Sequence, residues 1–274
     1  MMSATRLQFT DASVPKACDD DLAPRLTEPW SQRLLDEVTL KSGDLVLDIA
    51  TGDGTLARLA ASRIGSDGHV FAIDLSKPML DTAQAKPAPE CAARITYLQS
   101  PAAPLPGSSE IFDAVFCQQG LQFFPDRLAA LREMRRILKP DGRVALAVWA
   151  PLEQNQVFAA YHAALRATVS EELSSRMAAP FGWPDGAELK SAVEEAGFQE
   201  VRLSTPTIPL VLEGGVEQVI RAFSASTVSP CVAALSQDAQ KAFSARVRHE
   251  MSALLEIDGR IVGDMVSNII IAKP

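Results

Sequence analysis

The stretch GDLVLDIATGDGTLARLAA, from Gly43 to Ala61, decides the fold of this 274-residue chain. It opens with an apolar run that ends at Asp48, and it then passes through a turn of small residues that contains Gly52 and Gly54. Apolar residues recur after the turn at the spacing of one helix face, so the stretch predicts a strand, a tight turn and a helix. Glycines allow positive φ and a close ligand approach to bare backbone, and the helix directs its N-terminal amides at the turn. A binding loop at the carboxyl end of a parallel strand is therefore expected.

The rest of the chain continues the alternation of strands and helices. This pattern predicts an α/β, Rossmann-like, doubly wound and mostly parallel sheet of seven strands, with an antiparallel last strand and a helical cap. A helix capped by Thr27 precedes the first strand, and Lys139-Pro140-Asp141-Gly142 has the composition of a turn. The expected strands are 44–49, 69–74, 94–99, 112–117, 143–149, 201–212 and 264–272, and the expected helices are 54–64, a helix starting at 76, 126–138, 155–179, 185–196, 215–227 and 236–255.

Three regions are expected along the chain. Residues 1–26 are polar and predict a flexible lead-in. Residues 27–150 hold the regular alternation and the binding loop, so they predict the ligand-binding core. Residues 151–274 predict the remaining core strands and helix, with helical cap insertions near 152–180 and 213–260.

Composition excludes several classes of function. A net charge of -8 and a pI near 5.0 argue against a nucleic-acid surface. No apolar run reaches the length of a membrane span, and the N-terminus lacks the pattern of a secretory signal. The four cysteines are scattered without a CxxC pair, which predicts reduced thiols in a cytoplasmic protein, with neither a metal site nor a disulfide framework.

The loop by itself leaves two ligands open. Gly52-x-Gly54-x-x-Ala57 also fits the fingerprint of NAD(P)-dependent oxidoreductases, and Asp74, about 20 residues on, suits two ribose hydroxyls in either case. Asp48 and Asp53 would repel a diphosphate, whereas they would attract an ammonium or a sulfonium ion. These two carboxylates therefore favour S-adenosylmethionine (SAM) over a dinucleotide.

LVLDIATGDGTLARLA resembles motif I of class I SAM-dependent methyltransferases. HVFAIDLSKPML resembles their second block, and LKPDGRVALAVW resembles a later one. The likeness is strongest to the ubiquinone/menaquinone C-methyltransferase type and related small-molecule methyltransferases. It covers about residues 27–150, and PFGWPDGAELKSAVEEAGFQEVRL resembles the family's return into strand 6. The motifs are specific for the cofactor and uninformative about the substrate.

Carried over residue by residue, the resemblance implies how SAM would be held. Asp48 would orient the methionine ammonium through water, and Asp74 would hold the ribose hydroxyls. The chain departs from the family at Ser100-Pro101, where an Asp-Ala or Asn-Ala pair usually lies at the adenine edge, and Pro101 has no backbone N–H to donate. The implied cofactor contacts are Asp48, Ala50, Gly52, Gly54, Asp74, Leu75, Met79, Ser100, Pro101, Ala102, Cys117 and Gln118.

Candidate acceptor-binding residues follow strand 4 or lie where the cap should meet the sheet. Gln118 is expected to face the site, and Gln119 and Gln122 are expected to be solvated. His162 is the weak candidate for catalysis, as the histidine placed to look down from the cap, and Cys117 is interpreted as a small buried thiol. The aromatic residues are as well explained by cap packing as by an acceptor pocket. The candidate set is Gln118, Phe123, Trp149, Phe158, Tyr161, His162 and Trp183.

The chemistry that the resemblance implies is an in-line displacement at an activated methyl group. The protein need only align the acceptor and exclude water, so the absence of a nucleophile–base constellation does not count against catalysis. The expected acceptor is the O, N or C of a small, largely apolar biosynthetic metabolite such as a quinone or polyketide. The alternatives are an NAD(P)-dependent oxidoreductase and a SAM-binding protein without methyl transfer. Many such enzymes pair through their caps, so a homodimer is one assembly left open, but no stretch of this sequence indicates the oligomeric state.

Overall fold

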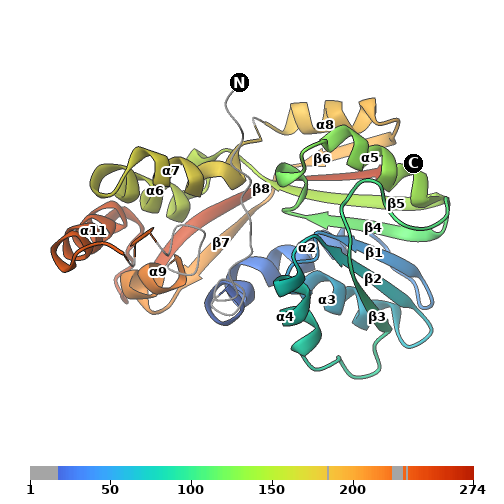
Figure 1. Ribbon diagram of the computed structural model, residues 1–274, viewed down its shortest axis with the longest axis horizontal. Coiled ribbons are helices and arrows are strands. Elements are labelled where there is room, and N and C mark those ends of the chain that lie inside the picture. The colour runs from blue at the N-terminus through green and yellow to red at the C-terminus, as the bar shows by residue number, and fades with distance from the viewer. Residues whose placement is uncertain (1–17, 184, 224–230, 233) are drawn as a thin grey trace.

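The computed structural model describes residues 18–183, 185–223, 231–232 and 234–274. Expectations for residues 1–17, and for the end of the helix expected over 215–227, lie outside the described residues. A sheet flanked by helices forms one half of the molecule, and a smaller helical lobe lies beyond the carboxyl ends of β4 and β5 (Figure 1). The lobe contains α6 (Gln156–Thr168), α7 (Glu171–Ala178), α9 (Gly215–Phe223) and α11 (Gln237–Glu250).

The sheet of the described chain has eight strands in the order β3-β2-β1-β4-β5-β8-β6, with β7 paired to β8. The first five strands are parallel to one another, and β8 is antiparallel to β5, β6 and β7. This is the predicted doubly wound sheet with an antiparallel last strand. The strands are β1 (Leu45–Ile49), β2 (His69–Asp74), β3 (Arg94–Gln99), β4 (Phe112–Gln118), β5 (Leu138–Trp149), β6 (Gln199–Ser204), β7 (Thr207–Leu212) and β8 (Ile261–Lys273).

The eighth strand arises because the single strand expected over 201–212 is broken. Its two halves, β6 and β7, pair with different halves of the long β8. The break falls at Thr205-Pro206, where proline has no N–H to continue a ladder. The long β8 therefore joins the core sheet to the helical lobe, as Figure 1 shows.

Helices cover both faces of the sheet, and each face has its own apolar core. α5 and α8 lie on one face, and α2 and α3 lie on the other (Figure 1). Ser76, Asp126 and Asp185 accept a hydrogen bond from the backbone three residues on and so cap α4, α5 and α8. The remaining helices are η1 (Cys18–Thr27), α2 (Glu28–Asp36), α3 (Thr55–Ile64), α4 (Lys77–Ala85), η2 (Leu121–Phe123), α5 (Arg127–Ile137), η3 (Leu152–Gln154), η4 (Ala179–Phe181), α8 (Gly186–Glu195) and η5 (Ser252–Leu254).

Two local predictions are wrong at the ends of these elements. Thr27 does not cap α2 with its side chain, because it is itself helical, with φ -72° and ψ -46°, as the last residue of η1. The lead-in expected to be flexible is thus helical from Cys18 onward. The turn expected at 139–142 lies within β5, because Leu138 already pairs with Phe112 across a bulge and Lys139 forms an ion pair with Asp113 at 2.7 Å.

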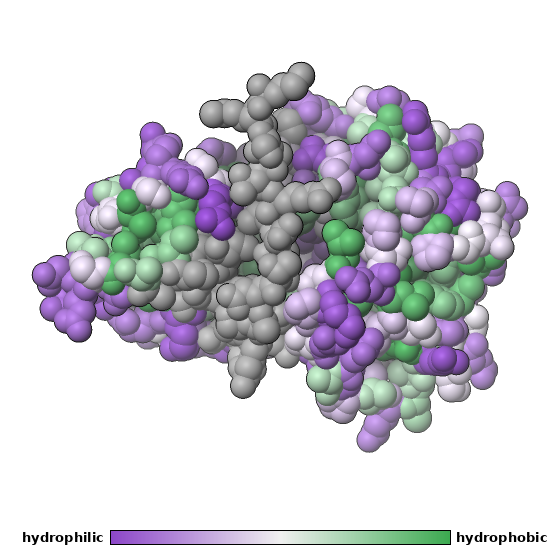
Figure 2. Space-filling view, in the orientation of Figure 1, coloured by the Kyte–Doolittle hydropathy of each residue, from purple (hydrophilic) through white to green (hydrophobic). Residues whose placement is uncertain are grey.

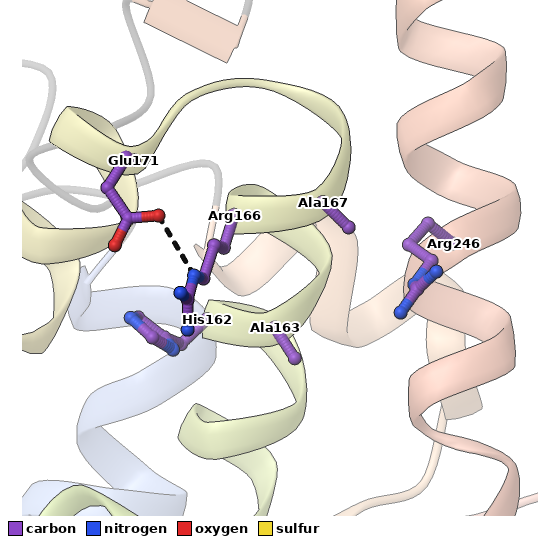
Figure 3. A pocket seen from close by; sticks show the side chains of 6 residues that line it. All are labelled: His162, Ala163, Arg166, Ala167, Glu171 and Arg246. Carbon is purple, nitrogen blue, oxygen red and sulfur yellow. Dashed lines mark hydrogen bonds and ion pairs between the residues drawn. The ribbon is translucent and has the colours of Figure 1, made fainter.

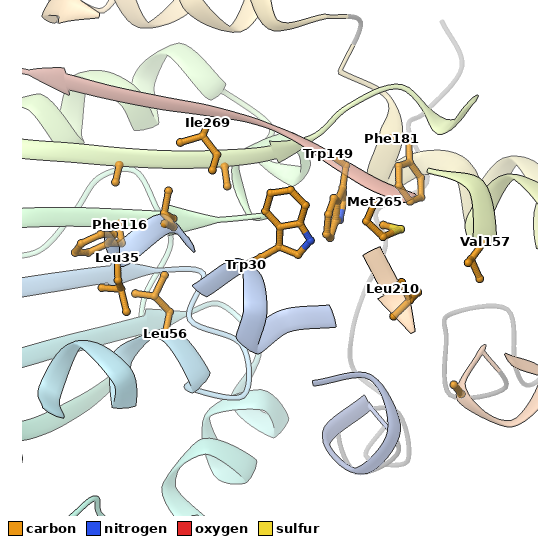
Figure 4. Close-up of a cluster of buried hydrophobic side chains, with 14 of the residues drawn as sticks. Trp30, Leu35, Leu56, Phe116, Trp149, Val157, Phe181, Leu210, Met265 and Ile269 are labelled. Carbon is orange, nitrogen blue, oxygen red and sulfur yellow. The ribbon is translucent and has the colours of Figure 1, made fainter. Parts of the chain in front are cut away.

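A row of aromatic rings crosses from the sheet into the lobe (Figure 4). Trp30 meets Trp149 edge-on with their centroids 5.6 Å apart, and Phe181 follows at 6.2 Å from Trp149. Phe158 lies 5.1 Å from Phe181, and the row continues to Phe223 at 4.6 Å. Such ring pairs add stability beyond the burial of their area. The row therefore ties the helical lobe to the carboxyl edge of β5.

The surface drawn in Figure 2 is mainly hydrophilic on both halves, and each half also carries smaller hydrophobic patches. Among the described residues, every helix is too short or too polar to cross a membrane.

Candidate functional site

The loop after β1 has a backbone that only part of its sequence favours. Gly52 and Gly54 have φ of 57° and 77°, and Ala50, which is not glycine, has φ 58°. A Cβ added to Gly54 would lie 2.9 Å from Ala83 Cβ and 3.0 Å from the Tyr97 hydroxyl, whereas one added to Gly52 would meet nothing within 4 Å. The loop is thus packed against the protein at Gly54 and open at Gly52. Strain of this kind, at Ala50, is typical of binding sites.

Asp48 is a buried carboxylate without a cationic partner. Its side chain is 1% exposed, and the Thr51 hydroxyl donates to it at 2.6 Å. The pKa of Asp48 is raised to about 7, chiefly by burial; the nearby carboxylates of Asp74 and Asp53 add to the rise, and the Thr51 hydrogen bond opposes it. No lysine or arginine of the described residues forms an ion pair with it. An ammonium or sulfonium ligand would supply the missing positive charge.

Asp74, at the end of β2, is held by backbone amides. Its Oδ2 accepts from Gly52 N at 2.9 Å, and its Oδ1 accepts from Ser76 N at 2.8 Å. Burial raises its pKa, and these amides oppose the rise. Leu75 beside it is 70% exposed, and Met79 is half-buried on α4. Asp74 therefore links the loop to β2 and still presents a carboxylate with an apolar shelf next to it.

Asp53 plays a different part from the one expected. It forms an ion pair with Lys86 at 2.9 Å and accepts from the Thr55 hydroxyl, also at 2.9 Å. Its charge is therefore compensated by a lysine, which weakens the sequence argument that Asp53 would repel a diphosphate. Lys86 and Tyr97 were missed because each contacts the loop from a position with no motif of its own, and Thr51 was missed although it lies within the loop motif. Only the spacing of Thr51, three residues after Asp48, could have indicated a contact.

The segment after β3 lies against β2 through its backbone. Ser100 is buried, its N–H donates to the Asp74 carbonyl at 3.0 Å, and its hydroxyl donates to the Pro101 carbonyl. Pro101 is exposed and Ala102 is half-buried. At the expected adenine edge, the Ser-Pro departure from the family pattern therefore places a hydroxyl that is already hydrogen-bonded to the backbone, where the family usually has an Asp or Asn side chain.

The end of β4 differs most from expectation. Cys117 is fully buried, and burial raises the pKa of its thiol, as suits an inert packing residue. The Gln118 amide faces α2: its Nε2 donates to the Thr27 carbonyl at 3.0 Å, and its Oε1 accepts from the Ser31 hydroxyl at 2.7 Å. Gln119 and Gln122 are not solvated but half-buried and buried. The expected solvent-facing amides instead belong to the interior of the site.

The cap candidates divide into three groups. Trp149, Phe158 and Tyr161 belong to the aromatic row or its extension, and Tyr161 and Trp149 are buried. Trp183 belongs to the opposite core, where the Arg127 guanidinium lies 4.4 Å from its ring centroid. His162 lines a groove between α6, α7 and α11 with Arg166, Glu171 and Arg246 (Figure 3). None of these groove residues comes from the loops after β1, β2 or β4. Phe123, at the end of η2, is 37% exposed.

Gly120 offers a stability test of how β4 meets the binding loop. A Cβ there would lie 2.5 Å from Ala50 Cβ and 3.0 Å from Cys117 Sγ. We expect Gly120→Ala to lower the free energy of unfolding by about 1–3 kcal/mol, the usual cost of overpacking, and to weaken SAM binding by displacing Ala50. Urea denaturation and calorimetric titration measure the two effects. Gly182→Ala, at an exposed glycine with φ -81°, is the control: its Cβ would lie 3.2 Å from the Ala179 carbonyl oxygen, so we expect a smaller loss of stability than in Gly120→Ala and no change in SAM binding.

A parallel sheet ordered 3-2-1-4-5, closed by an antiparallel strand and carrying two acids around a glycine turn, is the architecture of class I SAM-dependent methyltransferases. The uncompensated Asp48 and the amide-held Asp74 fit the cationic methionine end and the ribose of that cofactor. The chain belongs to the ubiE/COQ5 methyltransferase family, whose sequence profile matches residues 20–212. It is thus a SAM-dependent methyltransferase, and the dinucleotide alternative is not favoured.

Individual relatives agree with this assignment. Demethylmenaquinone methyltransferase from Staphylococcus aureus is 32% identical over 188 residues, covering 65% of this chain and 77% of the relative. Phosphoethanolamine N-methyltransferase 2 from Haemonchus contortus, solved with S-adenosyl-L-methionine, has a TM-score of 0.60 at 19% identity and covers 98% of this chain. This chain spans 58% of that longer protein. A SAM-dependent methyltransferase from Aquifex aeolicus has a TM-score of 0.54 at 23% identity, covering 72% of this chain and 92% of that one.

Proposed function

We propose that the acceptor is a small, largely apolar aromatic ring of the quinone type, methylated in its reduced, hydroxylated form. The observation that carries this proposal is the aromatic row, which begins with Trp30 and Trp149 at the carboxyl edge of the sheet and runs into the lobe. Apolar rings next to a charged cofactor loop suit an aromatic acceptor better than a phosphorylated amine. The named activity of the Staphylococcus aureus relative, at 32% identity, supports the same class.

The chemistry explains why the reduced form is the substrate. The sulfonium methyl is an electrophile, so the acceptor must supply an electron pair from an electron-rich ring carbon or a phenolic oxygen. A hydroquinone supplies one, whereas an oxidised quinone ring is electron-poor. The new C–C or O–C bond forms as the methyl–sulfur bond breaks, the sulfur keeps that bonding pair, and the acceptor loses a proton. No side chain need act as a nucleophile, which agrees with the inert, buried Cys117.

We also infer how the chain divides the work. Every residue proposed to hold SAM lies within 27–150, and Asp48, Asp74 and the open Gly52 would carry the methionine and ribose ends. The helical lobe formed by 152–180 and the described part of 213–260 would cover the acceptor and exclude water, because it lies beyond the carboxyl ends of β4 and β5 (Figure 1).

An acceptor panel tests the proposed function. The purified chain is mixed with SAM and, separately, with 1,4-naphthohydroquinone, 1-naphthol, 1,4-naphthoquinone and phosphoethanolamine under nitrogen. We expect S-adenosylhomocysteine and a methylated product from the hydroxylated naphthalenes only. Turnover with phosphoethanolamine alone would contradict the aromatic acceptor, and turnover with the oxidised quinone in place of the hydroquinone would contradict the reduced form.

A further inference from the structure

Four groups form a chain of hydrogen bonds at the carboxyl ends of β4 and β5, where the middle of the antiparallel β8 passes. Gln122 Nε2 donates to Gln119 Oε1 at 3.4 Å, and Gln119 Nε2 donates to the Ser267 hydroxyl at 3.0 Å. The Ser267 hydroxyl donates to the Val148 carbonyl at 2.8 Å. The sequence could not reveal this chain, because Ser267 lies 148 residues after Gln119.

The hydrogen bonds of this chain can run in only one donor-to-acceptor direction. A backbone carbonyl accepts and cannot donate, so the Ser267 hydroxyl must give its proton to Val148 and accept from Gln119. Gln119 then offers its oxygen to the Gln122 amide group. Each link fixes the orientation of the next, so Gln122 Oε1 is left as an acceptor and the Gln122 amide cannot turn over without breaking the chain.

Gln122 Oε1 has no partner among the described residues, and neither does the indole N–H of Trp183. Both side chains are more than nine-tenths buried, at 6% and 4% exposed. The Arg127 guanidinium contacts both residues: it donates to the Gln122 carbonyl at 2.9 Å and lies over the Trp183 ring. A buried acceptor and a buried donor without partners are costly, so native proteins usually pair them.

Gln122 lies in a segment next to the cofactor loop. η2, which carries Gln122, follows Gly120, whose Cα lies so close to Ala50 that no Cβ fits between them. At the other end of the hydrogen-bond chain, Ser267 is the β8 partner of Trp149. The hydrogen-bond chain therefore runs from the segment beside the proposed SAM loop to the strand pair at the start of the aromatic row.

We propose that Gln122 is a specificity-determining residue whose side-chain oxygen accepts a hydrogen bond from the acceptor's hydroxyl. A ketone or an ether oxygen has no proton for Gln122 and is selected against. The η2 segment must shift to admit the ring, because Gln122 Oε1 is enclosed. This inference rests on the proposed function, and it names the feature by which the reduced ring is told from the oxidised one.

Binding of two probes, in which the hydroxyl proton of the first is replaced by a methyl group in the second, tests the proposal. The chain is saturated with S-adenosylhomocysteine, which cannot transfer a methyl group, and titrated with 1-naphthol and with 1-methoxynaphthalene. We expect the wild-type chain to prefer 1-naphthol about tenfold, the scale of one net hydrogen bond. Gln122→Met, which keeps the length of the side chain without its oxygen, should reduce the preference to within about twofold on the same scale.

Gln154→Met makes the same chemical change at an exposed glutamine and should leave the preference intact. Affinity for S-adenosylhomocysteine checks that each variant is folded. A preference for 1-naphthol that survives in Gln122→Met overturns the inference. The proposed function still stands in that case, because the aromatic acceptor still binds. Equal binding of the two probes to the wild-type chain also overturns it. Failure of both naphthalenes to bind overturns the proposed aromatic acceptor, and the inference with it.

Discussion

Replacing Asp74 by Ala is expected to weaken SAM binding by about 100-fold, or about 2–3 kcal/mol, the range for lost hydrogen bonds to a charged group. Two effects add in the same variant. The ribose hydroxyls lose their carboxylate, and Gly52 N loses the acceptor that now holds it at 2.9 Å. Calorimetric titration with SAM measures the loss. Asp74→Asn keeps one side-chain oxygen that can accept from an amide of the loop. Its SAM affinity should therefore lie between those of the wild type and Asp74→Ala.

Asp81→Asn is the matched control for this prediction. Asp81 is an exposed carboxylate on α4, and its contact is an ion pair with Lys77 on the surface. Its removal deletes the same charge from the same helix neighbourhood without touching the loop, so SAM affinity should be unchanged. Equal affinity of Asp74→Ala and wild type would refute the role given to Asp74.

The second large effect is a dependence of SAM affinity on pH that originates at Asp48. Its pKa is raised to about 7 in the free protein, chiefly by burial and then by Asp74 and Asp53. The cationic cofactor binds the protein in which the Asp48 carboxyl is ionised. Below pH 7 this carboxyl is mostly protonated, so it must lose its proton before the cofactor binds. Affinity should therefore rise about tenfold per pH unit between roughly pH 5 and 7 and level off above. Titrations in two buffers of different ionisation enthalpy count the proton released on binding.

Stability of the free protein should move in the opposite direction. A carboxyl whose folded pKa lies above its unfolded value binds an extra proton in the folded state between the two values. The free energy of unfolding is then greatest below about pH 4 for this group and declines as pH rises through 7, by up to about 4 kcal/mol. Asp48→Asn removes the titrating group, so it should flatten both profiles. A wild-type SAM affinity equal at pH 5.5 and 7.5 would contradict the assignment.

The elements of the core sheet could be predicted from sequence because their signals are local. β2 and β3 have the expected bounds, 69–74 and 94–99, and β1 and α3 differ from expectation by one residue at the start. Apolar runs, glycine turns and capping residues act within a few positions, so one stretch carries them. The wrong predictions of strands and turns fall where pairing with a segment distant in sequence decides the local structure. Pairing with β4 turns the Lys139–Gly142 segment into strand, and β8 pairs separately with the two halves of 201–212.

The sequence by itself determined the acid pair and the glycine turn of this methyltransferase, because Asp48, Gly52 and Asp74 sit at fixed offsets from strands that local patterns define. Only the tertiary structure decided that Lys86 forms an ion pair with Asp53, and that the Gln118 amide is hydrogen-bonded to Ser31 of α2. It also decided that Gln122 begins the chain of hydrogen bonds that ends at the Val148 carbonyl. Each of these depends on hydrogen bonds or charges from segments far apart in the chain. Hydrogen bonds and ion pairs are short-ranged and directional, so they are settled only when packing brings those segments within about 3 Å of each other.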